Sequence, residues 1–141
     1  MQDFQSLEAR SFAAANPAGG AEFSHTVPAG EVWHLLAVTV ANVQAAAGAS
    51  QPILVIDDGT NVLFESFGSS AAQAISTTCQ YTWAAGLPLT GQIGATTNVH
   101  STGPLPAGLI LLPTWRIRSV TIGLSANTDY GVPRLYAVEL S

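Results

Sequence analysis

The sequence predicts an all-β protein, a two-sheet antiparallel sandwich of about eight strands, with a jelly roll as the preferred topology. The 141 residues include 13 glycines and 8 prolines, which interrupt the chain at short intervals. β-Branched and aromatic residues fill the stretches between them, and no helical periodicity follows residue 20. An immunoglobulin-like sandwich is the alternative, but its disulfide frame is missing because Cys79 is the only cysteine.

The chain divides into a short N-terminal arm, residues 1–20, and a sandwich domain, residues 21–141. In the arm, Phe4, Leu7 and Phe12 would lie near one face of a short helix or act as anchors of an extended segment. A proline and paired glycines at the end of the arm stop either structure. We therefore expect these three side chains to contact a partner rather than the core of their own chain.

Eight segments read as strands: 21–27, 31–43, 51–57, 61–67, 74–83, 105–112, 115–124 and 133–140. The longest, 31–43, is mostly apolar at both odd and even positions, so we expect core on one face and a partner on the other. Segment 74–83 alternates with period two, and one face carries Ile75, Thr77, Cys79, Tyr81 and Trp83. Residues 86–103 are expected to form a long polar loop.

Charged residues make up only 9% of the chain, against roughly 25% in an average soluble domain. The chain has no lysine, its formal net charge is -5, and its positive residues are Arg10, Arg116, Arg118 and Arg134. So few cations argue against nucleic-acid binding, which needs several phosphate neutralisers. No apolar run reaches the roughly 18–20 residues of a membrane helix. The first residues lack a signal-peptide pattern, so we expect synthesis and assembly in a cytoplasm.

A surface with few charges, and with no lysine to protect any strand edge, is expected to be covered by partners. We therefore expect a subunit of an assembly, in contact with copies of itself or with other proteins. The partner faces would be the outer faces of segments 31–43 or 105–112.

Motifs for catalysis are missing from the sequence. His25, His34 and His100 are far apart and have no metal-binding spacing, so we predict no metal and no other cofactor. Cys79 has no cationic neighbour in the sequence and is expected in the core as a small apolar residue. No nucleophile elbow, phosphate loop or dinucleotide fingerprint occurs. We therefore predict a protein without enzymatic activity.

Two further patterns have a structural and a functional interpretation. Asp57–Asn61 offers oxygen ligands for calcium but lacks the twelve-residue loop, and an Asp-Gly pair between two strands favours a hairpin turn. The tryptophans could form a sugar-binding platform, but large aromatic residues more often pack in a core or an interface. We expect the latter for Trp33, Trp83 and Trp115.

The segments Val27–Val40 and Leu105–Pro113 each begin with an apolar residue and a Pro-Ala-Gly turn before a strand, and Arg116–Val120 follows the second. Over residues 21–140 this pattern resembles the jelly-roll-like cement or decoration proteins of tailed bacteriophage heads. The resemblance implies a non-enzymatic protein of the virion, on the outer capsid surface, that clamps neighbouring major capsid protein subunits. Head-fibre and tail-associated sandwiches that bind a receptor or a glycan look similar and are the alternative.

Overall fold

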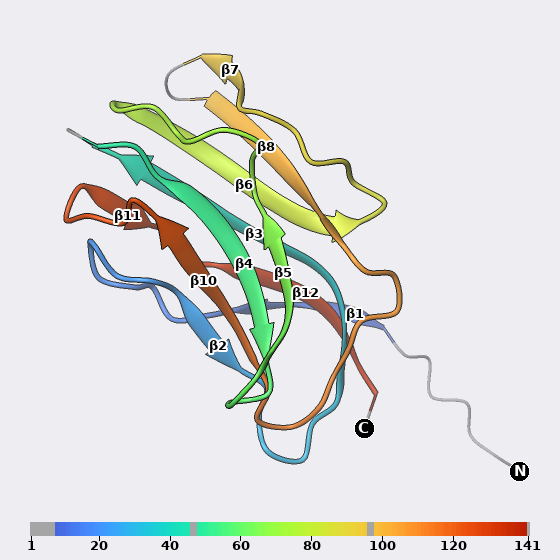
Figure 1. Cartoon of the computed structure of the whole chain (residues 1–141). Coiled ribbons are helices and arrows are strands. Elements are labelled where there is room, and N and C mark those ends of the chain that lie inside the picture. Colours follow the sequence, from blue (N-terminus) through green and yellow to red (C-terminus); the bar gives the residue numbers. More distant parts are fainter. Residues whose placement is uncertain (1–7, 46–47, 96–97, 141) are drawn as a thin grey trace, which may run out of the picture.

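The computed structural model describes residues 8–45, 48–95 and 98–140, and every regular element within them is a β-strand. The strands are β1 (Ala9–Ala13), β2 (Ser24–Thr26), β3 (Trp33–Gln44), β4 (Gln51–Asp57), β5 (Val62–Phe67), β6 (Thr77–Ala85), β7 (Ile93–Ala95), β8 (Asn98–Leu105), β9 (Ile110–Leu111), β10 (Arg116–Ile122), β11 (Thr128–Tyr130) and β12 (Arg134–Glu139). They form two sheets in two layers (Figure 1). The predicted all-β, two-sheet architecture is confirmed.

The smaller sheet, sheet B, has the strand order β2-β10-β4-β5 and is antiparallel throughout. The larger sheet, sheet A, has the order β1-β12-β3-β6-β8-β7, and β9 and β11 also pair with β3. Among the described strands, only β6 and β8 run parallel. A parallel pair needs a connection that returns along the sheet, and the segment between these two strands makes that return. It includes β7, which pairs with β8.

The strand β3 is the centre of sheet A, with β12 and β11 on one side and β9 and β6 on the other. Its register with β12 shifts next to Tyr136. Because of this bulge, Trp33 and Leu35 face the core before the shift, and Val38 and Val40 face it after the shift. Both odd and even positions of β3 are apolar because the inward-facing residues are odd-numbered before the bulge and even-numbered after it. The sequence suggested that both faces of this segment are buried, but the apolar pattern does not require it.

Two predicted segments are corrected by the structure. Residues 86–103 are not one loop, because they contain β7 and most of β8. In the predicted strand 105–112 only β9 remains as a separate strand, since the Pro-Ala-Gly turn reverses the chain at Gly108, where φ is +69°. Leu105 itself is the last residue of β8.

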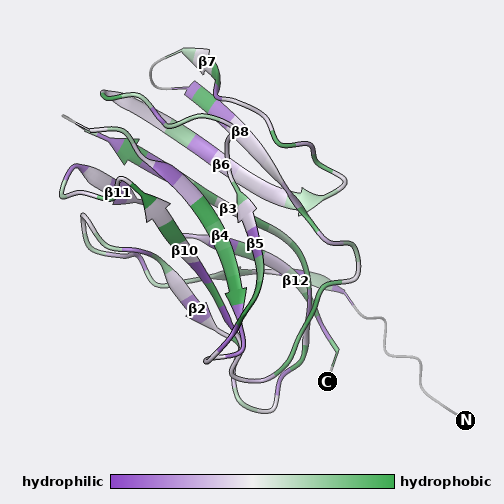
Figure 2. Ribbon diagram, viewed as in Figure 1, coloured by the Kyte–Doolittle hydropathy of each residue, from purple (hydrophilic) through white to green (hydrophobic). Residues whose placement is uncertain are grey.

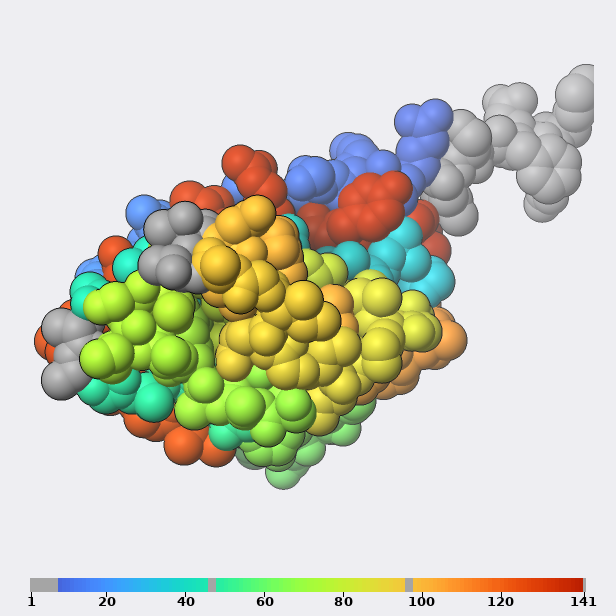
Figure 3. Space-filling model, turned by 90° about the horizontal axis from the view of Figure 1, so that it is seen from above, coloured from blue at the N-terminus to red at the C-terminus, as the bar shows by residue number. Residues whose placement is uncertain are grey.

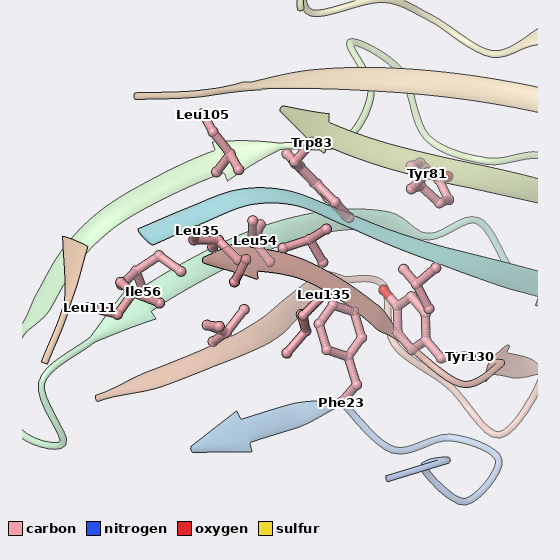
Figure 4. Packing of buried hydrophobic residues seen from close by; sticks show 14 of the residues in the cluster. Phe23, Leu35, Leu54, Ile56, Tyr81, Trp83, Leu105, Leu111, Tyr130 and Leu135 are labelled. Atoms are coloured by element: carbon pink, nitrogen blue, oxygen red, sulfur yellow. The ribbon is translucent and has the colours of Figure 1, made fainter. Parts of the chain in front are cut away.

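The core lies between the two sheets, where Figure 4 shows aromatic and aliphatic side chains from both layers. Cys79, Tyr81 and Trp83, which the alternation placed on one face, are fully buried, whereas Ile75 precedes β6 and is exposed. Trp33 is also buried, and Trp115 is partly buried against the same cluster. The tryptophans are therefore core residues, as expected.

The structure corrects the predicted arm, residues 1–20, over the part of this segment that it describes. Residues 9–13 form β1, which pairs along its whole length with β12. Phe12 packs against the core of its own chain, and its ring stacks on Trp33 at a centroid distance of 4.3 Å. Burial of this ring explains why the segment joins the sheet. Phe4 and Leu7 lie outside the described residues.

Candidate interaction surfaces

The outward side chains of β10, β4 and β5 form a surface that we call the sheet B outer face. It consists of Arg116, Arg118, Val120, Ile122, Ile53, Val55, Asp57, Glu65 and Phe67. The inward neighbours on the same strands belong to the core or are buried. Hydrophobic residues follow β4 and the last part of β10 in Figure 2.

One end of the sheet B outer face carries two cations and one buried anion. Asp57 accepts hydrogen bonds from Arg116 Nε at 2.7 Å and from Arg116 Nη2 at 3.1 Å, and a third from Arg118 Nε. Burial alone would raise the pKa of Asp57. The hydrogen bonds from the two arginines and from the Gly59 amide outweigh burial and lower the pKa to about 2. The carboxylate therefore stays charged and locks β10 to β4.

The same aspartate begins the β4–β5 turn. Asp57 accepts the Gly59 amide at 2.8 Å, and Asp58 accepts the amides of Thr60 at 2.9 Å and Asn61 at 2.6 Å. These carboxylates are engaged by backbone amides and arginines. The predicted hairpin turn is confirmed.

The other end of the sheet B outer face is apolar. Val120 lies opposite Ile53 on β4, and Ile53 lies opposite Phe67 on β5. Val120 is 39% exposed and Phe67 40%. Large apolar side chains in direct cross-strand contact, rimmed by charged residues, are typical of a protein–protein interaction site.

The opposite surface, the sheet A outer face, consists mostly of small or uncharged side chains. Its rows across the strands are Tyr136–Ala37–Ala84–Pro104, Arg134–Thr39–Thr82–Thr102, Ala41–Gln80–His100 and Asp129–Val43–Thr78. Within the strands described, Arg134 and Asp129 are the charged residues of this face.

Hydrogen bonds fix the middle of the sheet A outer face. Thr39 Oγ1 donates to Tyr81 O at 3.1 Å and lies 3.3 Å from Thr82 Oγ1. Gln80 Nε2 donates to Thr39 Oγ1. These side chains are held in place before any partner arrives, so they would lose little conformational entropy on binding.

A network of buried amides and hydroxyls holds the loops at one end of the sandwich. Asn42 Nδ2 donates to Gln73 Oε1 at 2.9 Å and to Ser50 Oγ at 3.1 Å, and Tyr81 OH donates to Gln73 Oε1 at 2.9 Å. Figure 3 shows segments 68–76 and 86–92 next to each other, joined by the hydrogen bond from Ser70 N to Thr90 O. The network is structural, since its members are buried.

The histidines lie apart in the structure as well. His25 on β2 stacks on Trp33, His34 lies between Ile110 and Val138 on the sheet A outer face, and His100 bonds Asn98 at 3.0 Å. In residues 8–45, 48–95 and 98–140, no histidine is hydrogen-bonded to a serine, cysteine or carboxylate, and no group of three metal-ligating side chains occurs.

Cys79 is completely buried, and burial raises the pKa of its thiol to about 11. It is therefore protonated at neutral pH and is a core residue, as the sequence predicted.

Sequence reasoning missed the sheet B outer face. Its signal was present in the alternation of Arg116, Arg118, Val120 and Ile122 on one side of a strand. What the sequence could not show is that Ile53 and Phe67 continue this face across two further strands.

No protein-family model, curated protein or solved structure matches this chain. Within the described residues, no helix has the length and hydropathy needed to cross a membrane. The fold and these surfaces define an all-β sandwich whose two outer faces are candidate interaction surfaces.

Proposed function

We propose that this protein is a non-enzymatic virion protein of a tailed bacteriophage, a cement protein that binds the outer capsid surface and clamps neighbouring major capsid protein subunits. The β-sandwich fold and the motif resemblance of residues 21–140 support this proposal. Assembly would take place in the host cytoplasm. Neither nucleic acid nor a membrane is part of the proposed binding.

The observation that carries the proposal is the sheet A outer face. It spans β1, β12, β11, β3, β6 and β8, and its described charges are Arg134 and Asp129. Few charges must be desolvated when such a face is covered, so a neighbouring subunit can pack closely on it. Because exposed ion pairs contribute little, binding should depend weakly on salt.

The proposed action is mechanical. A shell filled with DNA is under outward load, and a subunit that bridges two capsid proteins opposes it by adding buried area across the seam. A standard interface buries about 1,600 Å² in total. Many copies on one shell act together, so even weak single contacts resist rupture.

The test compares particles of the parent phage with and without the protein. Particles without it should lose DNA at a lower temperature, and added protein should restore their stability at both low and high salt. The variant Thr82→Arg places a charge in the middle of the sheet A outer face and should fail to restore it. Thr60→Arg, in the exposed β4–β5 turn, is the matched control and should act like the unmodified protein.

The alternative function, a head-fibre or tail-associated module that binds a receptor or a glycan, has less support. Glycan sites on sandwich loops usually present clustered aromatic rings, and residues 86–103 contain none. The exposed rings of Phe67 and Tyr136 lie on opposite outer faces. Unchanged particle stability without the protein would contradict the cement function and favour this alternative.

A further inference from the structure

The charges of the sheet B outer face are not paired one to one within one chain. Arg116 and Arg118 share the single carboxylate of Asp57, which leaves one positive charge over. Arg118 uses only Nε in this contact, and its side chain is 26% exposed. Its terminal nitrogens are therefore available to a second carboxylate.

The acidic residue in the same cross-strand row as Arg118 is Glu65, on the far side of β4. Arg118 pairs in register with Val55, and Val55 pairs with Glu65 on β5. Two strand spacings, about 10 Å in total, separate the arginine from the glutamate. Glu65 is exposed and makes no ion pair with any described residue. The cation and the acid thus flank β4 symmetrically without reaching each other.

We propose that a second copy of the chain docks on the sheet B outer face, around a two-fold axis parallel to β4. This rotation exchanges β10 with β5, so Arg118 of each copy faces Glu65 of the other. A two-fold interface must be complementary to itself, and this row of charges has that property.

The apolar row formed by Val120, Ile53 and Phe67 is also complementary to itself about this axis. With the axis over β4, Val120 of each copy packs on Phe67 of the other, and Ile53 packs on its own counterpart. An axis along the strands keeps the strand directions of the two sheets aligned, which is the common geometry of two sheets packed about 10 Å apart.

The contact is small. Three strands about 4.8 Å apart and about seven residues long give a face of roughly 340 Å² on each copy, well below the roughly 800 Å² per partner of a standard interface. We therefore expect a dimer that dissociates on dilution. In this dimer the two sheet A outer faces point away from each other and remain free. The inference does not depend on the proposed function, because it concerns the purified protein alone.

A thiol cross-link tests the position of the axis. In the variant Ile53→Cys the new thiols of the two copies face each other across sheets about 10 Å apart, which is too far for a direct disulfide, so a short bis-maleimide should join them and give a covalent dimer on a denaturing gel. The control Ile122→Cys lies on the same face but one strand off the axis, so its two thiols are farther apart and the same short reagent should not span them. Cys79 is buried and adds no background. Equal cross-linking of both variants, or none by Ile53→Cys in a folded sample, would overturn the proposal.

A charge reversal tests the contact without a new thiol. Sedimentation over a concentration series should show a monomer–dimer equilibrium for the unmodified protein. Glu65→Lys places like charges opposite Arg118 at two symmetric positions, and it should weaken the dimer at least tenfold. Glu8→Lys makes the same charge change at an exposed position just before β1 and should leave the dimer unchanged. A protein that stays monomeric at all concentrations, or equal effects of the two variants, would contradict the inference.

Discussion

Phe12 of β1 stacks on Trp33 of β3 with a centroid distance of 4.3 Å and an interplanar angle of 26°. The two strands do not pair with each other, because β12 lies between them. The His25 ring of β2, in sheet B, also stacks on this indole, at a centroid distance of 5.2 Å. Trp33 therefore connects the edge strands of both sheets, and residues close to the N-terminus belong to the core.

We predict that Phe12→Ala destabilises the protein by about 1–3 kcal/mol. The ring is only partly buried, so the loss should be smaller than for a fully buried phenylalanine. Urea unfolding followed by tryptophan fluorescence measures it. Ser11→Ala, an exposed neighbour on the same strand, should stay within about 0.5 kcal/mol. Equal stability of the two variants would mean that β1 does not contribute to the core.

Asp57 should make stability depend on acid pH. Its pKa is about 2 in the folded protein, against an ordinary value of 3.8. Because the pKa is lower in the folded state, the charged carboxylate stabilises the fold at any pH above the pKa of the unfolded chain. This contribution is lost as pH falls from about 4 to 2. The difference corresponds to about 2 kcal/mol. Unfolding free energies between pH 2 and 7 should show this loss, and Asp57→Asn should start lower at pH 7 and show a smaller slope.

Gly103 should tolerate no side chain. A Cβ at this position would lie 2.2 Å from Phe67 O and 2.8 Å from Trp83 Cδ1, where β8 approaches β5. We expect Gly103→Ala to cost about 2–3 kcal/mol, because backbone cannot move as easily as a flexible side chain. Gly19→Ala is the control, since nothing lies within 4 Å of its Cβ. Thermal unfolding of both variants decides the matter, and a Gly103→Ala protein as stable as the control would refute the close approach.

His25 should affect stability near neutral pH. Burial lowers its pKa, although Glu31 acts in the opposite direction. The unfolded chain then takes up the proton more readily, so this contribution to stability is present above about pH 6.5 and is lost as pH falls below it. His25→Phe keeps a ring against Trp33 and should flatten the pH dependence of unfolding between pH 5 and 7. His100→Gln, at an exposed site, should keep the slope of the unmodified protein.

The sequence by itself determined the all-β class, the alternation along β6 and the turn at Asp57–Asn61. These features depend on local properties: period-two alternation, φ restrictions at Pro and Gly, and short-range bonds from carboxylates to backbone amides. The structure has the same β4, Gln51–Asp57, that the turn signals predicted.

The tertiary structure alone decided which strands are neighbours. Asp57 and Arg118 are 61 residues apart in the chain, and their contact depends on the register between β4 and β10. The parity change in β3 and the return of Phe12 to the core are likewise set by distant pairings, with β12 in both cases. Local patterns cannot specify these relationships, because many registers satisfy the same alternation and only packing across the whole sandwich selects one.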